Sequence, residues 1–193
     1  MSKKELIFAT HNAHKAEEIQ SILGESFVVK TLTDIGIHEE IEEIGKELKD
    51  NAYIKSSYVY KKTGLNVFSD DTGLEVTALN GAPGVYSARY AGDKKNDTEN
   101  INLLLKNISS FEDKTAQFHT VMSLFWEGQH YYFNGVCKGI ISSKRLGDNG
   151  FGYDPIFIPE GYTQSFAQMT PKQKNILSHR GRAIKEMTSF LLT

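Results

Sequence analysis

Cysteine is nearly absent from this chain: Cys137 is the single example among 193 residues. One cysteine cannot form an internal disulfide, so nothing in the sequence requires an oxidising compartment. Because Cys137 lies in a predicted strand, we interpret it as a small packed residue rather than a nucleophile. The sequence also has no repeat, no low-complexity segment and no linker rich in proline or serine, which together with the chain length favours a single domain.

Long hydrophobic runs are missing as well. The first apolar run covers only residues 6–9, whereas the core of a signal peptide needs about 7–15 apolar residues. No segment approaches the roughly 18 apolar residues of a membrane span. We therefore expect a cytoplasmic protein with no membrane partner.

Neither sign of charge is in excess: 22 Lys and Arg stand against 24 Asp and Glu, a formal net charge of -2. A general nucleic-acid binder usually carries a basic excess, so no nucleic-acid partner is expected. The hydrophobic content of 39% also excludes a disordered acidic chain. The charges are unevenly distributed, however, because seven acids lie from Asp34 to Asp50 and none lies in residues 161–185.

Strand and helix patterns alternate in the first half of the chain. Short strands are predicted at residues 6–9, 27–29 and 66–69, with helices at about 16–23, 47–62 and 98–105. Residues 115–126 and 131–141 then predict an antiparallel hairpin. A final helix is predicted to begin with Thr170 as N-cap and Pro171 at its first position, and to continue to Leu191. This order indicates an α/β fold with a mixed sheet.

A polar turn, Thr10-His11-Asn12, follows the first predicted strand and precedes a helix. The free N–H groups at a helix N-terminus attract anions, and Lys15 would add a full positive charge in the first turn. An ordinary N-capping turn with a solvated lysine is the alternative. The glycines of a Walker A loop or a dinucleotide-binding turn are missing, so neither of those sites is indicated.

Two adjacent aspartates, Asp70 and Asp71, come at the end of the predicted strand 66–69. Two ionised carboxylates side by side in a partly buried loop are costly unless a cation is present. Hard oxygen ligands of this kind suit Mg²⁺, although a solvated Asp-rich turn is the alternative. The acidic run at residues 39–43 would matter only if the fold brought one of its glutamates beside Asp71.

Two later segments could bind a nucleotide. Glycines on both sides of Phe151 would present an aromatic face suited to stacking on a base, and Asp154 could accept hydrogen bonds from a base edge. A turn with a core phenylalanine is the alternative. In the final helix, Lys174, Ser178 and Arg182 are predicted to line one face at four-residue spacing, for which a charged solvent face is the alternative.

Taken in this order, the segments resemble the inosine triphosphate pyrophosphatase family, which hydrolyses deaminated purine nucleoside triphosphates to the monophosphate and pyrophosphate. Three departures are small: His11 stands where glycine is frequent, Ser69 where alanine is common and Thr72 where serine is common. The matching patterns span residues 10–180 and are Thr10-x-Asn12-x-x-Lys15, Glu42-Glu43-x-Gly45 with Asp50-Asn51-Ala52, Asp70-Asp71-Thr72-Gly73-Leu74, Gly81-Ala82-Pro83-Gly84-Val85-Tyr86-Ser87-Ala88-Arg89, Gly150-Phe151-Gly152-Tyr153-Asp154-Pro155, and Lys174 with Ser178-His179-Arg180.

The resemblance implies an α/β fold with an elongated mixed β-sheet flanked by helices, as one domain over residues 1–193 with two lobes and a central nucleotide cleft. It also implies a homodimer. The implied substrates are ITP, dITP and XTP, which the enzyme would remove from the nucleotide pool before their incorporation into DNA or RNA.

The resemblance further implies a set of site residues. Mg²⁺ would be held by Glu42 and Asp71, and Asp71 would also act as the catalytic base. Asp70 stays open as the base, because a metal-bound carboxylate has a lowered pKa and is a weaker base. The residues implied to bind substrate are Thr10, His11, Asn12, Ala13, His14, Lys15, Thr72, Phe151, Gly152, Tyr153, Asp154, Lys174, His179 and Arg180.

Three other functions compete with this one. A nucleotide pyrophosphatase acting on modified pyrimidines or methylated nucleotides would differ in its substrate ranking. A nucleotide sensor that does not hydrolyse would not need both the aspartates and Lys15. An RNA-binding protein using the basic final helix fits poorly with the near-neutral net charge.

Overall fold

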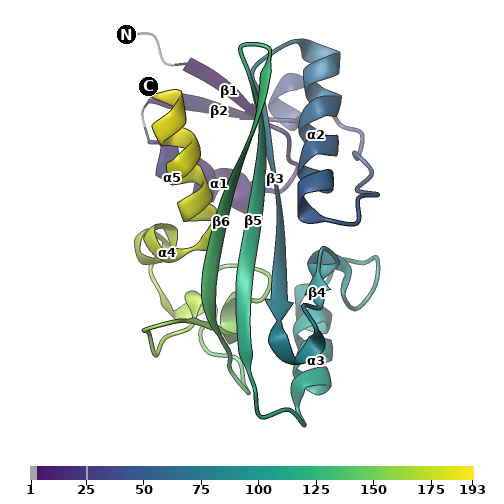
Figure 1. Cartoon of the computed structure of the whole chain (residues 1–193), viewed down its shortest axis with the longest axis vertical. Coiled ribbons are helices and arrows are strands. Elements are labelled where there is room, and N and C mark those ends of the chain that lie inside the picture. The colour runs from purple at the N-terminus through teal and green to yellow at the C-terminus, as the bar shows by residue number, and fades with distance from the viewer. Residues whose placement is uncertain (1–3, 25) are drawn as a thin grey trace. The chain divides into compact units, whose positions relative to one another are not determined.

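The computed structural model describes residues 4–24 and 26–193 (Figure 1). Its strands and helices, in chain order, are β1 (Lys4–Phe8), α1 (Ala13–Leu23), β2 (Phe27–Thr31), α2 (Leu48–Thr63), β3 (Val67–Val76), β4 (Pro83–Gly84), α3 (Asp97–Ile108), β5 (Thr115–Trp126), β6 (Gln129–Ile141), β7 (Phe157–Pro159), α4 (Pro171–Leu177) and α5 (His179–Leu191).

The strands form a mixed sheet in the order β2-β1-β3-β5-β6-β7, with β4 paired to β3. β1 runs parallel to β2 and β3, whereas the β3–β4 and β6–β7 pairs are antiparallel. The prediction of an α/β fold with a mixed sheet is therefore confirmed. None of the helices in the described ranges is long and apolar enough to span a membrane.

The chain divides into two compact units, each assembled from separate stretches of sequence. Unit 1 comprises residues 1–71, 120–135 and 180–193, and unit 2 comprises residues 72–119 and 136–179. Three divisions fall inside β3, β5 and β6, so each of these strands contributes one part to each unit, and the fourth falls after His179, the first residue of α5.

Unit 1 buries both faces of β1. Leu6 and Phe8 lie in a cluster with Ile184 of α5, whereas Ile7 lies in a second cluster with Val59 of α2. Successive side chains of a strand point to opposite faces, which explains why this short apolar run is buried on both sides. Since β1 is parallel to β3, the turn after β1 and the aspartates that follow the first residues of β3 lie at the same end of these two strands.

Unit 2 has its own hydrophobic cluster, in which Leu74 of β3 and Leu104 of α3 are fully buried together with Phe157. Cys137 belongs to the same cluster, and its thiol is buried. Its predicted role as a small packed residue is confirmed.

Two predictions of element boundaries were wrong. β3 continues through Asp70 and Asp71 to Val76, so the aspartates lie inside a strand and not at its end. The final helix is interrupted at Ser178, which is extended with φ −67° and ψ 156°. Serine with this backbone is typical of an N-cap, and it separates α4 from α5. Lys174 and Arg182 therefore do not share one helix face.

Candidate active site

The polar turn after β1 forms the N-terminus of α1. The Thr10 hydroxyl oxygen accepts a hydrogen bond from the Asn12 N–H at 3.1 Å, and the Asn12 side-chain oxygen accepts one from the Lys15 N–H at 3.1 Å. Asn12 is thus the N-cap, as expected for a polar residue before a helix. The other predicted residues of the turn are exposed, and these are His11, Ala13 and His14.

Asp70 is buried between two cations. Its Oδ1 lies 2.9 Å from Lys15 Nζ, and its Oδ2 accepts from Nε and Nη2 of Arg180 at 3.3 Å each. Arg180, only 2% exposed, also donates from Nη1 to Glu18 at 2.5 Å. Burial alone would raise the pKa of Asp70, but Lys15 and Arg180 outweigh it and hold that pKa far below its usual range. Asp70 is therefore ionised at neutral pH.

Asp71, the next residue of β3, has a different environment. Its Oδ2 accepts from Asn51 Nδ2 at 3.1 Å, and its Oδ1 lies 3.8 Å from Lys55 Nζ. Lys55 is also ion-paired with Glu43. Burial is the main reason that the pKa of Asp71 is raised; Lys55 opposes the rise, and Glu43 adds to it. The two neighbouring carboxylates thus differ in how readily they take up a proton.

The same helix, α2, carries two residues that contact Asp71. Asn51 and Lys55 are four residues apart, which places them on one helix face. The Asn51 side-chain oxygen also accepts from the Gly45 N–H at 2.8 Å, so the acidic segment before α2 is tied to the same point. Burial would lower the pKa of Lys55, but Asp71 and Glu43 outweigh it and raise that pKa, so the side chain is a cation.

The residues around Asp71 fit a magnesium ion held largely by substrate oxygens. Asp71 and Glu43 share Lys55, whereas Glu42, the glutamate predicted as a ligand, is exposed. In residues 4–24 and 26–193, no three His, Cys, Asp or Glu side chains converge on one point. Such a site suits Mg²⁺ because this ion is often bound by one or two carboxylates plus substrate phosphates.

In unit 2, the predicted aromatic loop is held by a buried ion pair. Asp154 Oδ2 accepts from the Phe151 N–H at 2.9 Å and from Lys174 Nζ at 2.7 Å. Lys174 Nζ also lies 4.7 Å from the centre of the Phe151 ring. The N–H of Gly152 donates to the Asp97 carboxylate at 2.6 Å. Phe151 itself is half-buried.

The remaining predicted residues of unit 2 are mostly buried. His179 stacks on Phe118 with ring centres 4.5 Å apart, and Tyr153 donates its hydroxyl to the Ser87 carbonyl at 2.8 Å. Thr72 is half-buried in β3. The predicted site residues therefore form two groups, one around Asp70 and Asp71 in unit 1 and one around Phe151 in unit 2.

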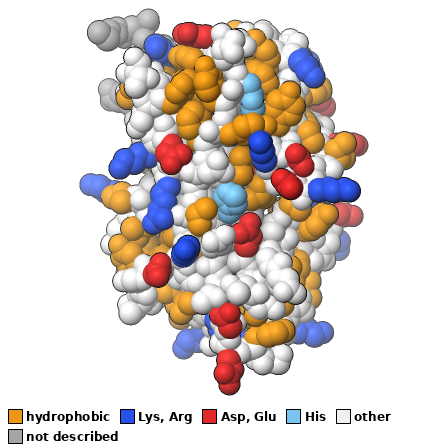
Figure 2. All heavy atoms as spheres, viewed as in Figure 1, with side chains coloured by type: hydrophobic (Ala, Val, Ile, Leu, Met, Phe, Trp, Pro, Cys, Tyr) orange, Lys and Arg blue, Asp and Glu red, His pale blue; other side chains and the backbone are white. Residues whose placement is uncertain are grey.

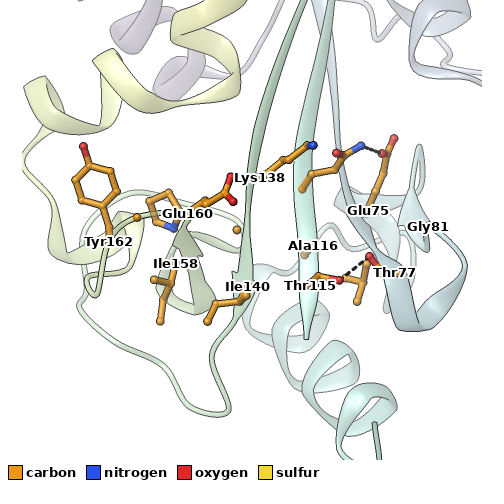
Figure 3. A pocket seen from close by; sticks show the side chains of 15 residues that line it. Glu75, Thr77, Gly81, Thr115, Ala116, Lys138, Ile140, Ile158, Glu160 and Tyr162 are labelled. Carbon is orange, nitrogen blue, oxygen red and sulfur yellow. Dashed lines mark hydrogen bonds between the residues drawn. The ribbon is translucent and has the colours of Figure 1, made fainter. Parts of the chain in front are cut away.

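Unit 2 also contains a cavity of about 620 Å³ on β3, β5, β6 and β7 (Figure 3). Its lining includes Glu75, Gln117, Lys138 and Tyr162, and none of the predicted site residues lines it. We take the aspartates as the candidate active site instead, because buried charges with opposed pKa shifts are typical of catalytic sites, and the cavity lining has no such pair.

Three residues of the unit 1 group were missed from the sequence. Lys55 is one of several lysines on α2, and only its spacing from Asn51 distinguishes it from the others. Glu43 cannot be told from Glu42 by pattern, and Glu18 lies in an ordinary helix. The one available signal was the i, i+4 pair of Asn51 and Lys55.

Comparisons with known proteins agree with this picture. The profile of the Ham1 family matches residues 6–190. A dITP/XTP pyrophosphatase of Christiangramia forsetii is 48% identical over 96% of this chain and 98% of its own length, and one of Porphyromonas gingivalis is 46% identical over 98% of each. The solved Ham1 protein of Staphylococcus aureus is 38% identical, with a TM-score of 0.88 over 98% of both chains. The predicted relationship is confirmed, and the chain belongs to the Ham1 family.

Proposed function

We propose that the chain, a nucleoside triphosphate pyrophosphohydrolase, hydrolyses dITP, XTP and ITP to the monophosphate and pyrophosphate with Mg²⁺ as cofactor. The observation that carries this proposal is the pair Asp70 and Asp71, buried next to each other among Lys15, Lys55 and Arg180. The names of the similar proteins supply the substrate class. In a cell, such an activity would remove deaminated purine nucleotides before their incorporation into DNA or RNA.

Asp71 is the better candidate for the catalytic base. A general base works best when its pKa lies near the working pH; bound Mg²⁺ would lower the pKa of Asp71, but burial acts in the opposite direction and raises it. Asp70 is bonded to Lys15 and Arg180 and would accept a proton only in strong acid. In the proposed step Asp71 takes a proton from water, the water oxygen bonds to the α-phosphorus, and the bond from that phosphorus to the oxygen bridging to the β-phosphorus breaks.

The triphosphate would bind where unit 1 concentrates positive charge. Lys15 and the N-terminus of α1 lie next to Asp70, and the turn residues Thr10 and Asn12 end β1 beside them. A helix N-terminus and a lysine together favour phosphate oxygens. Lys55, on the other side of Asp71, adds a second cation.

Asp71 together with a glutamate of the acidic segment would hold Mg²⁺. When bound, the ion would offset the charge of the triphosphate and orient it. Glu43 is favoured over Glu42, because it lies beside Lys55 and raises the pKa of Asp71 through its charge.

The base would be bound by the residues of unit 2. Phe151 offers a ring for stacking, and Lys174 lies over that ring. A donor of unit 2 aimed at position 6, such as His179, would hydrogen-bond the 6-oxo group of hypoxanthine or xanthine. Adenine would place a donor against that donor and leave both unpaired, which costs about 1–3 kcal/mol for each buried group.

The decisive experiment is a substrate panel of ITP, dITP, XTP, GTP and ATP with Mg²⁺, in which pyrophosphate and phosphate are measured separately. We expect pyrophosphate from the first three, low activity on ATP and loss of activity with a chelator. Release of phosphate in place of pyrophosphate would refute the proposed bond cleavage. Equal kcat/KM for ATP and ITP would refute the selectivity.

We also propose that the protein is a homodimer that does not bind nucleic acid. On the face drawn in Figure 2, Lys and Arg side chains are interspersed with Asp and Glu, with no broad basic area. Sedimentation of the purified protein tests the first part, since a monomer at micromolar concentration would contradict it. A gel shift with RNA at low salt tests the second.

A further inference from the structure

The residues that contact Asp71 depend on how α2 is fixed. Asn51 and Lys55 both project from α2 toward Asp71. A small rotation or shift of α2 would change both contacts together. The contacts that hold α2 in place therefore determine the geometry around Asp71, which matters for catalysis if the proposed function is correct.

A chain of hydrogen bonds connects α2 to β5 and β6 beside these two residues. The Ser56 hydroxyl of α2 lies 2.6 Å from the Ser123 hydroxyl of β5, and Ser123 lies 2.7 Å from Nε2 of His130 in β6. At the other end, Ser56 donates to the carbonyl oxygens of Ala52 and Tyr53 at 3.2 Å. Ser56 and Ser123 are fully buried, so water does not substitute for these partners.

The number of available protons determines which group donates at each step of this hydrogen-bond chain. Ser56 has one hydroxyl proton, and when it donates that proton to α2 it must accept from Ser123. Ser123 then has no proton left and must accept from His130. This arrangement makes three hydrogen bonds, whereas the reverse direction makes only two, since Ser56 would no longer donate to α2. The favoured form of His130 therefore carries a proton on Nε2.

Aromatic rings pack around the His130 end of the chain. The His130 ring makes an edge contact with Tyr53 of α2 at 5.1 Å and lies 4.6 Å from Phe125, both measured between ring centres. Tyr132 is 4.4 Å away, and Lys49 of α2 lies over the Tyr132 ring. α2 is thus held against β5 and β6 by both hydrogen bonds and ring contacts.

We propose that His130 is a positioning residue, which acts through Ser123 and Ser56 to hold α2 so that Asn51 and Lys55 meet Asp71. His130 donates from Nε2 to Ser123, and the hydrogen-bond chain ends on the carbonyl oxygens of Ala52 and Tyr53, the two residues that follow Asn51. The inference rests on the proposed function for its kinetic consequence, but the hydrogen-bond chain itself can be tested without substrate.

The kinetic test compares variants that interrupt the hydrogen-bond chain with variants that retain it. Ser123→Ala removes the middle link, and His130→Phe keeps a ring but loses the donor. Both should lower kcat for dITP roughly tenfold, because small displacements of catalytic groups are costly, while KM changes by less than about twofold. His130→Gln keeps an N–H near the Nε2 position and should restore most of kcat.

Ser57→Ala is the matched control. Ser57 is also a buried serine of α2, but its hydroxyl donates to the Ile54 carbonyl within the helix. Its kcat should stay near that of the wild type. If Ser123→Ala and His130→Phe lower only the melting temperature and leave kcat unchanged, His130 is merely structural and the proposal is wrong. It is equally wrong if His130→Gln behaves like His130→Phe.

Nitrogen-15 NMR of the histidine side chains provides a readout without substrate. The wild type should show the Nε2–H tautomer at His130, and Ser123→Ala should speed hydrogen exchange of the amides at residues 51–56. An Nδ1–H tautomer, or unchanged exchange, overturns the positioning role. A wild type that releases no pyrophosphate refutes the proposed function instead, and these spectra still decide the role of His130.

Discussion

Asp70 and Asp71 are neighbours in one strand, yet their surroundings give them opposite tendencies to bind a proton. Alternate residues of a strand face opposite sides, so the two side chains meet different elements. Asp70 meets Lys15 of α1 and Arg180 of α5, and Asp71 meets α2. One carboxylate thus serves as a fixed negative charge, and the other is able to exchange a proton.

Replacing each aspartate by asparagine should separate these roles. Asp71→Asn should lower kcat at least about a hundredfold, since a proton acceptor is removed, with the fold retained. Pyrophosphate release and the melting temperature are the two measurements. Near-normal turnover in Asp71→Asn would show that another group is the base.

Asp70→Asn should act mainly on stability and should do so in a pH-dependent way. Removing one partner of a buried ion pair costs about 3–5 kcal/mol, because Lys15 and Arg180 stay buried. The folded pKa of Asp70 is depressed, so its stabilisation is present above the unfolded pKa of about 4 and is lost as the pH falls below that value. Denaturant unfolding of both proteins should therefore show a large difference at neutral pH that shrinks in acid. A difference independent of pH would contradict the assignment.

The two glutamates of the acidic segment form a second residue-level test. Glu43→Gln should lower activity at limiting Mg²⁺ by roughly tenfold or more, because a ligand and a partner of Lys55 are both lost. The exposed Glu42→Gln is the matched control and should be close to wild type. The apparent Mg²⁺ affinity for pyrophosphate release is the measurement. A larger loss of apparent Mg²⁺ affinity in Glu42→Gln than in Glu43→Gln would show that Glu42 is the metal ligand.

At the scale of elements, the loop at residues 150–154 depends on a close approach of backbone and carboxylate. A Cβ at Gly150 would lie 2.1 Å from Asp154 Oδ2, whereas a Cβ at Gly152 meets nothing within 4 Å. Both glycines have positive φ, so both alanine variants are strained and only Gly150→Ala also displaces Asp154. The pair of variants isolates the effect of that displacement.

Gly150→Ala should raise KM for dITP about tenfold or more. The displaced Asp154 would no longer hold the Phe151 N–H, and the purine of the substrate would lose the ring on which it stacks. Gly152→Ala should raise KM far less, although strain of about 1–2 kcal/mol is expected in each variant. Steady-state kinetics on both proteins, with melting temperatures as a control for folding, tests this. Equal KM values in the two variants would show that the Asp154 contact does not support base binding.

Sequence patterns predicted the elements well where a cap or a buried run marks them. α1 and α2 end at the C-caps Gly24 and Gly64, close to the predicted ends at 23 and 62, and the Thr170 capping box begins α4. The patterns failed where tertiary contacts decide. β3 runs on through polar residues because Asp70 and Asp71 find buried partners, which their sequence neighbours do not reveal. The pairing of Arg180 with Asp70 spans 110 positions and has no local signal.

At the scale of the whole molecule, the units are interleaved in sequence. Unit 1 uses three stretches and unit 2 uses two, and the chain passes from one to the other within β3, β5 and β6 and again after His179 in α5. Neither unit is a continuous segment, so unfolding one must pull on strands that belong to the other. We expect the chain to unfold in a single cooperative step.

Trp126, the single tryptophan, reports on unit 1. Leu104→Ala removes a fully buried side chain in unit 2 and should destabilise the protein by about 2–5 kcal/mol. Under cooperative unfolding the Trp126 fluorescence midpoint in guanidinium should fall by the same amount as the midpoint from circular dichroism. A fluorescence midpoint that does not move would show that the two units unfold independently.

The guanidinium that neutralises Asp70 reaches β3 from the last of the three stretches of unit 1. During translation, the ribosome therefore completes both aspartates long before it makes Arg180. A nascent chain, or one ended early by a damaged message, has Asp70 with Lys15 as its partner from α1 but lacks Arg180. Burying a carboxylate without its full set of partners is costly, so the site can close only on a finished chain. Truncated products should be cleared by proteases before they can act on nucleotides.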